Sequence, residues 1–159
     1  LAADLVVAEL LARGAAGALV SIGGDLAARG TPVSEDGWPV SVEHPLEPTR
    51  ELVRLLVSNG GVATSSTRTR RWSDGCTTRH HLIDPTTRTP STTDLAAVTV
   101  IAPYGWLAEA HATAALLAGS DGVLDYLHDE GLDGVAGTAD GRILATVDCA
   151  PVADRAVAG

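Results

Sequence analysis

Apolar residues in the first part of the chain fall into short stretches that are separated by glycines. Residues 2–13 (AADLVVAELLAR) are rich in helix formers, and their apolar positions predict a helix that ends at Gly14. Residues 18–22 (ALVSI) form an apolar run that predicts a buried strand. Gly23-Gly24-Asp25 follows that strand directly. The first expected elements are therefore a helix, a short loop, a strand and a glycine turn.

In residues 31–66, prolines and a pair of glycines mark the expected loops and turns. Residues 31–48 carry prolines at four positions, so they predict a loop that contains one strand around 38–42. The apolar run 52–57 is followed by the turn residues 59–61 and by the run 62–66. Two such runs around an Asn-Gly turn are typical of a β-hairpin, so we expect them to pair with each other.

The second half of the chain alternates between clear strand and helix patterns. Residues 96–102 predict a strand, and residues 106–118, rich in Ala and Leu, predict a helix. Ser120 can cap a third helix that runs to about residue 130. Residues 134–138 and 142–147 flank an Asp-Gly turn and predict a closing hairpin. The whole pattern predicts an α+β fold, with a mixed or antiparallel sheet and packed helices.

Length and charge narrow the class of protein. A chain of 159 residues is the size of one domain or of a large piece of one. With 20 acidic and 11 basic residues its net charge is −9, which argues against binding nucleic acid or an anionic membrane. No apolar run approaches the roughly 20 residues that cross a bilayer. Cys76 and Cys149 form no CxxC pair, so neither a thiolate zinc site nor a disulfide framework is indicated.

The chain begins at Leu1, inside the first predicted helix. We therefore expect it to be a fragment whose N-terminal part is missing. A membrane anchor or a signal peptide could lie only in that missing part, so the compartment stays open. All of the basic residues are arginine, which is typical of a GC-rich bacterial genome.

Two polar segments carry groups that could meet a phosphorylated ligand. Gly23-Gly24-Asp25 allows a close backbone approach, although a plain turn is the more economical interpretation. Residues 63–68 (ATSSTR), with Arg70 and Arg71 just beyond, combine hydroxyls with guanidinium groups that suit phosphate oxygens. A polar hairpin with solvated charges is the alternative, and composition alone favours it.

Two further pairs could act on a substrate or hold a metal. His80 and His81 precede Asp84-Pro85; in a strand they would point to opposite faces, and His81 would share a face with Ile83. An imidazole can act as a general base, but a lone histidine is more often a packed structural residue. Glu109 and Thr113 are spaced to lie on one helix face and are hard oxygen ligands for Mg²⁺. The alternative is that Glu109 only complements the helix dipole.

Taken in order, four segments resemble the C-terminal portion of the ApbE family, the FAD:protein FMN transferases. HHLIDP is the most specific element, and it lies within the third segment. The segments are 2–30 (AADLVVAELLARGAAGALVSIGGDLAARG), 61–72 (GVATSSTRTRRW), 80–90 (HHLIDPTTRTP) and 96–119 (AAVTVIAP followed by LAEAHATAALLAG). The resemblance implies an ApbE-like, T-fold-like α+β architecture in which residues 1–159 form the C-terminal portion of a single domain.

The resemblance also implies roles for individual residues. His81 matches the family's histidine before Asp-Pro and is the candidate base. Glu109 and Thr113 occupy the positions that hold Mg²⁺. The implied cofactor-binding residues are Asp4, Gly23, Gly24, Asp25, Thr64, Ser65, His80 and Ile83.

The activity implied by the resemblance is transfer of FMN from FAD to a Thr or Ser hydroxyl of a flavin-accepting protein, with Mg²⁺ required and AMP released. Glu109 stands where the family has Asp, and Arg88 stands where it has Gly. If that glycine has a positive φ, Arg88 is strained by about 1–2 kcal/mol. A non-catalytic FAD-binding homologue and a FAD pyrophosphatase are the alternatives.

Overall fold

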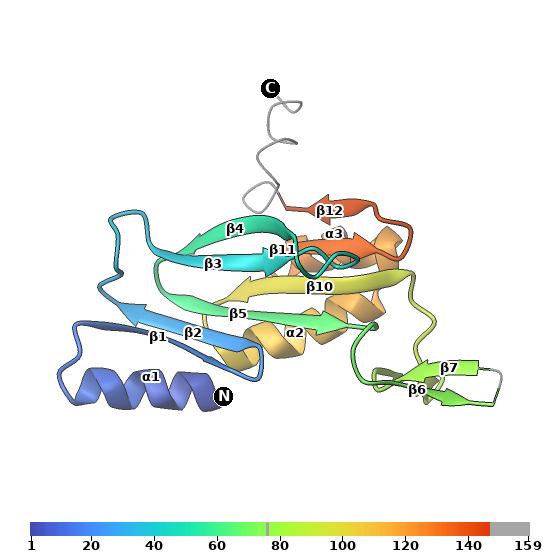
Figure 1. The fold of residues 1–159 in the computed structure, drawn as a ribbon, viewed down its shortest axis with the longest axis horizontal. Helices are drawn as coiled ribbons and strands as arrows, with labels where there is room; N and C mark the ends of the chain where they lie inside the picture. The colour runs from blue at the N-terminus through green and yellow to red at the C-terminus, as the bar shows by residue number, and fades with distance from the viewer. Residues whose placement is uncertain (76, 147–159) are drawn as a thin grey trace, which may run out of the picture.

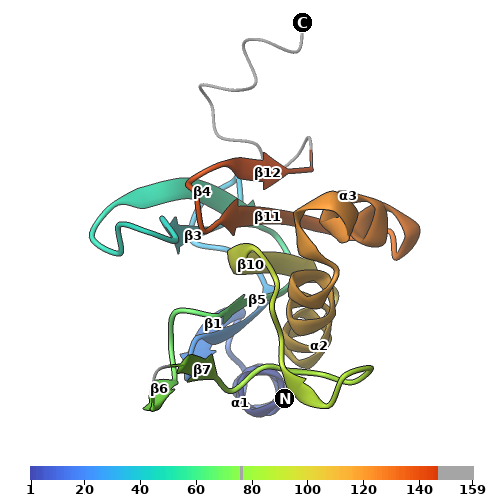
Figure 2. The same ribbon diagram turned by 90° about the vertical axis from the view of Figure 1, so that its right-hand side faces the viewer.

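A six-stranded antiparallel sheet forms the centre of the computed structural model, which describes residues 1–75 and 77–146. Its strand order is β1-β2-β5-β10-β11-β12. Helices α2 and α3 cover one face, the small sheet β3-β4 packs on the other, and α1 lies beside β1 and β2 (Figures 1 and 2). The helices are α1 (Ala2–Ala12), α2 (Gly105–Leu117) and α3 (Gly119–Asp129). The strands are β1 (Gly17–Ile22), β2 (Asp25–Gly30), β3 (Trp38–Glu43), β4 (Glu51–Val57), β5 (Gly60–Ser66), β6 (Arg71–Asp74), β7 (Thr77–His80), β8 (Ile83–Asp84), β9 (Thr89–Pro90), β10 (Leu95–Ala102), β11 (Asp133–Thr138) and β12 (Ile143–Ala145).

Strand alternation divides the core between the two faces of this sheet. On the helical face, Val98 and Val100 of β10 pack against Leu116 of α2 and Leu127 of α3. On the opposite face, side chains of β3 and β4 pack against Leu26 of β2 and other residues of the central sheet. Within the described ranges, no helix is long and apolar enough to cross a membrane.

The predicted α+β class and the antiparallel sheet are confirmed, and so are most of the elements. The helices predicted at 2–13 and 106–118 differ by a residue or so from α1 and α2. The strand predicted at 96–102 is the core of β10, and the closing hairpin is β11-β12. Val147, the last residue of the predicted hairpin, lies outside the described residues, as do Cys76 and Cys149.

The hairpin predicted from 52–57 and 62–66 is wrong. Strand β4 pairs with β3, whereas β5 pairs with β2 and β10 in the central sheet. Gly60 and Gly61 are the first residues of β5 and not turn residues. A Cβ on Gly61 would lie 2.1 Å from the backbone nitrogen of Gly105, so this glycine lets β5 run directly under the start of α2.

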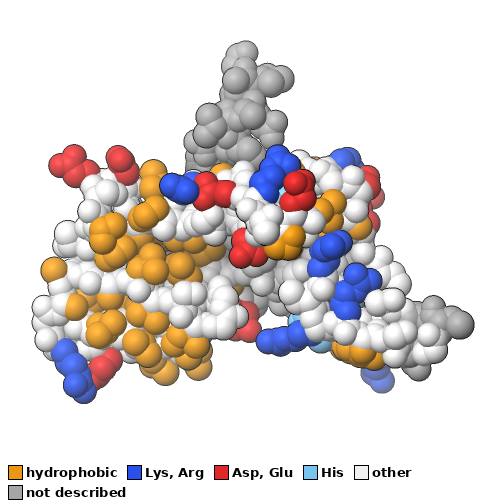
Figure 3. Space-filling model, viewed as in Figure 1, with side chains coloured by type: hydrophobic (Ala, Val, Ile, Leu, Met, Phe, Trp, Pro, Cys, Tyr) orange, Lys and Arg blue, Asp and Glu red, His pale blue; other side chains and the backbone are white. Residues whose placement is uncertain are grey.

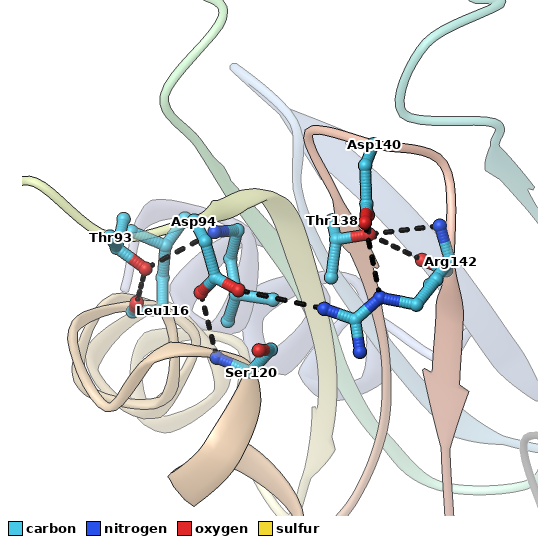
Figure 4. A network of polar contacts seen from close by, with 8 residues as sticks. Thr93, Asp94, Leu116, Ser120, Thr138, Asp140 and Arg142 are labelled. Atoms are coloured by element: carbon cyan, nitrogen blue, oxygen red, sulfur yellow. Dashed lines mark hydrogen bonds and ion pairs between the residues drawn. The ribbon is translucent and has the colours of Figure 1, made fainter.

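The expected cap of the third helix is also wrong, because the side chain of Ser120 does not cap it. Asp94, in the loop before β10, takes that role: its Oδ1 accepts a hydrogen bond of 2.9 Å from the backbone nitrogen of Ser120 (Figure 4). Hydrogen bonds from the Ser120 side chain and backbone hold the pKa of Asp94 below its usual value. Arg142 of the β11-β12 turn contacts the other oxygen at 3.8 Å. Asp94 therefore joins α3 to the closing hairpin.

Candidate active site

The middle of the candidate site is the place where α2 crosses the end of β5. Small residues allow this crossing, because Ala63, Ala102 and Ala108 form a tightly buried cluster between the strands and the helix. Further along, the Oγ of Ser65 and the Oγ1 of Thr113 form a hydrogen bond of 2.8 Å. Ser65 is thus hydrogen-bonded directly to Thr113, which the sequence predicts to be a Mg²⁺ ligand.

Asp25 brings a carboxylate to the same face. Gly23 and Gly24 have φ values of 65° and 103°, and this left-handed pair forms the tight turn between β1 and β2. Asp25, the last residue of the Gly-Gly-Asp motif, is the first residue of β2. Burial raises the pKa of the Asp25 carboxyl, and the negative charge of the nearby Glu109 raises it further. A side-chain hydrogen bond that protonated Asp25 can donate to Glu109 acts in the same direction. Asp25 and Glu109 therefore lie close together, as two acidic groups whose negative charges repel.

Asp4 extends from α1 to the site, where its carboxylate accepts hydrogen bonds from the backbone of α2. Its Oδ1 accepts a hydrogen bond of 2.8 Å from the backbone nitrogen of Gly105, and its Oδ2 accepts one of 3.1 Å from Trp106. Burial acts to raise the pKa of Asp4, but these hydrogen bonds outweigh it, and the pKa lies below its usual value. Asp4 caps the N-terminus of α2 and thereby fixes the helix that carries Glu109 and Thr113.

Thr64 and Ser65 do not meet at one place. Successive residues of a strand point to opposite faces, and the Oγ1 of Thr64 forms a hydrogen bond of 2.8 Å with the Oγ1 of Thr99, away from α2. The family resemblance implies that both hydroxyls bind the cofactor, although strand alternation alone separates them. Of this pair, the structure brings only Ser65 to Thr113.

The histidine pair lies where the predicted continuous strand is broken. β7 ends at His80, and β8 begins at Ile83. Between them Leu82 is buried in the core beneath α2, which anchors this segment to the helical face. Ile83 is 48% exposed.

The two histidines differ in what their rings contact. The Nε2 of His80 lies 3.0 Å from the carbonyl oxygen of Ser91, and its Nδ1 accepts a hydrogen bond of 3.3 Å from the backbone nitrogen of Leu82. His80 therefore holds the backbone of its own segment. The Nδ1 of His81 is buried and has no hydrogen-bond partner in the described part of the chain. Burial lowers the pKa of His81, and the neighbouring Arg70 and His80 lower it further, so its neutral form is favoured.

Comparison with known proteins places this arrangement in a family. A model of the ApbE family matches residues 1–136. The FAD:protein FMN transferases of Salmonella typhimurium and Escherichia coli are each 30% identical to the chain over 132 residues, which is 82% of this chain and 38% of each relative. The chain therefore spans less than half the length of these relatives.

Solved structures give the same result. The ApbE protein of Thermotoga maritima has a TM-score of 0.81 at 26% identity, covering 91% of this chain and 48% of its own. The flavinyl transferase ApbE of Pseudomonas stutzeri, in its apo form, has a TM-score of 0.74 at 26% identity, covering 97% of this chain and 47% of its own. These similarities and the family match over most of the chain lead to one conclusion: the chain belongs to the ApbE family.

Proposed function

We propose that the whole protein transfers FMN from FAD to a Thr or Ser hydroxyl of a target protein and releases AMP. Residues 1–159 would supply the C-terminal portion of the transferase domain. The observation that best supports this proposal is the grouping of Asp25, Glu109 and the Ser65–Thr113 pair at one crossing of sheet and helix, in a chain of this family. These residues offer oxygen ligands, and the histidine segment is anchored on the same face of the sheet by Leu82, which packs in the core beneath α2.

His81 is the proposed base. The acceptor oxygen attacks the phosphorus of the FMN moiety, a new P–O bond forms, and the P–O bond to the AMP moiety breaks with AMP as the leaving group. His81 takes the hydroxyl proton, which requires a neutral imidazole. Its lowered pKa favours that state at neutral pH.

A divalent cation fits the donor set at the crossing. Glu109, Asp25 and Thr113 offer oxygen atoms only, which Mg²⁺ prefers, and the two carboxylates repel each other until a cation neutralises them. The described residues hold no group of three or more His, Cys, Asp and Glu side chains that could bind a metal, so the Thr113 hydroxyl would have to complete the set. When bound, Mg²⁺ would supply positive charge that offsets the phosphates of FAD.

Magnesium is expected to raise the melting temperature of the wild-type protein and to lose that effect when Glu109 is replaced by glutamine. At about 100 times its Kd, a cation that binds only the folded state stabilises it by about 2.7 kcal/mol. Without the cation, Asp25→Asn should itself raise the melting temperature, because an ionised group with a raised pKa destabilises the folded state at neutral pH. Differential scanning calorimetry with MgCl₂ against NaCl of equal ionic strength measures both effects.

The matched control is Glu43→Gln, which removes an exposed carboxylate from β3, on the sheet face opposite α2. It should leave the magnesium effect as large as in the wild type. An equal magnesium effect in Glu109→Gln would show that Glu109 is not a ligand.

The function itself is tested by incubating the whole protein with FAD, Mg²⁺ and a threonine-containing acceptor peptide. Transfer predicts a peptide whose mass increases by that of one bound FMN, and an equal amount of AMP. The same peptide with valine in place of threonine is the control. Free FMN with AMP would instead support the FAD pyrophosphatase, and unchanged FAD that stays bound would support the non-catalytic homologue.

A further inference from the structure

Arginine is distributed unevenly over the structure. Five of the eleven arginines lie between positions 68 and 88, around hairpin β6-β7 and the β8-β9 turn. Figure 3 shows blue arginine side chains gathered at that end of the molecule, with a pale-blue histidine surface beside them. Several arginines elsewhere pair with acids, as in Arg13 with Glu9, Arg50 with Glu47 and Arg54 with Glu51. Arg68, Arg70, Arg71 and Arg88 are exposed and have no ion pair with another described residue.

Arg70 is the member of this group whose charge acts on the candidate base. In hairpin β6-β7, Arg71 pairs with His80, and Arg70 and His81 are the residues that directly flank this pair on the two chain segments. The electrostatic effect of Arg70 on the pKa of His81 agrees with this placement. An unpaired guanidinium group therefore lies beside a histidine whose Nδ1 is buried without a partner.

The backbone of Arg70 is in an unfavourable conformation. Arg70 and Arg88, with φ values of 48° and 57°, are the only non-glycine residues in the described ranges that have a positive φ. A residue with a branched or long side chain is seldom held in this region, and such strain is concentrated at functional sites. The left-handed backbone of Arg70 is therefore consistent with a functional role for this cationic residue near His81.

We propose that Arg70 binds a phosphate of the diphosphate substrate and holds it against His81. This inference rests on the proposed function and extends it, because it names a group that recognises the substrate. A planar guanidinium group can donate two parallel hydrogen bonds to phosphate oxygens, and Arg70 has no carboxylate partner that would compete. The acceptor hydroxyl must lie within reach of the base while it attacks the phosphorus, so a cation near His81 is placed to meet the phosphate oxygens.

The test compares Arg70→Gln and Arg70→Lys with the wild type in binding three ligands to the whole protein: FAD, inorganic pyrophosphate and riboflavin. Arg70→Gln is expected to weaken FAD and pyrophosphate about tenfold and to leave riboflavin unchanged, because riboflavin carries no phosphate. Arg70→Lys should recover part of the loss, since it keeps the charge but not the planar fork. Arg54→Gln, an exposed arginine on β4, is the control and should bind all three ligands as the wild type does. Isothermal titration calorimetry supplies the dissociation constants.

Two outcomes would overturn this assignment. If Arg70→Gln weakened the binding of riboflavin and of FAD equally, Arg70 would support the flavin site only indirectly. Unchanged FAD and pyrophosphate binding, with a raised KM for the acceptor protein alone, would show that the arginines contact an acidic acceptor surface.

Pyrophosphate binding that depends on Arg70 in a protein without transferase activity would uphold this inference while refuting the proposed function. Arg70→Gly, which relieves the left-handed backbone, should lose pyrophosphate binding without losing thermal stability.

Discussion

Replacing His81 with alanine is expected to lower the rate of FMN transfer by about a thousandfold, the middle of the range over which a general base contributes. The fold should survive, because the Nδ1 of His81 makes no hydrogen bond to another described residue. FAD affinity should change little, since the base acts on the acceptor hydroxyl. Single-turnover release of AMP, measured with the acceptor peptide at saturation, separates this chemical step from binding.

The pH profile gives a second readout of the same residue. The pKa of His81 is lowered from its usual value near 6.5, so the acid limb of the wild-type rate should lie below pH 6.5. The same shift affects stability: protonation favours the unfolded state, and the contribution present above pH 6.5 is lost as pH falls through the folded pKa. His81→Ala should remove this part of the acid-induced loss of stability.

Two other histidines serve as controls. His128→Ala changes an exposed residue of α3 and should alter neither rate nor stability. His80→Ala removes a ring whose two nitrogens contact backbone atoms, so it should reduce stability by about 1–3 kcal/mol. A His81→Ala protein that keeps more than a tenth of the wild-type rate would show that another group takes the proton.

Local pattern was enough to predict most elements of this fold, because helix and strand periodicity depends on near neighbours. The apolar run of β10 and the Ala-rich pattern of α2 are examples. Strand pairing depends instead on contacts distant in sequence. An Asn-Gly turn and two apolar runs indicated a hairpin at 52–66, yet β5 lies in the central sheet because the glycine at its start fits beneath α2.

In the candidate site, too, some features follow from local sequence pattern and others depend on contacts distant in sequence. The residue types and their order carried the family resemblance, which the comparisons confirmed. The contacts between them are tertiary: Asp4 caps a helix that begins 101 residues later, and Ser65 bonds to Thr113 across 48 residues. Such partners cannot be read from spacing. The opposite orientations of Thr64 and Ser65 could have been predicted, because they follow from strand alternation.

Gly61→Ala is expected to destabilise the protein by about 3 kcal/mol or more, through overpacking of backbone against backbone. The new Cβ would lie 2.1 Å from the nitrogen and 2.3 Å from the Cα of Gly105, and neither atom belongs to a side chain that could turn away. The start of α2 must then move off β5. That movement would strain the hydrogen bonds from α2 to Asp4 and the Ser65–Thr113 pair, so the magnesium effect on melting temperature should fall as well.

Gly122→Ala is the matched control for this substitution. Gly122 lies in α3, and its added Cβ would meet the Cβ of Ala118 at 3.5 Å, which is ordinary van der Waals contact. Alanine is favoured over glycine in a helix by about 0.5–1 kcal/mol, so this variant should be slightly more stable than the wild type. Urea unfolding compares the two variants directly. Equal stability of Gly61→Ala and wild type would mean that β5 and α2 do not lie in backbone contact, and the geometry that joins Asp4, Ser65 and Thr113 in one site would fail with it.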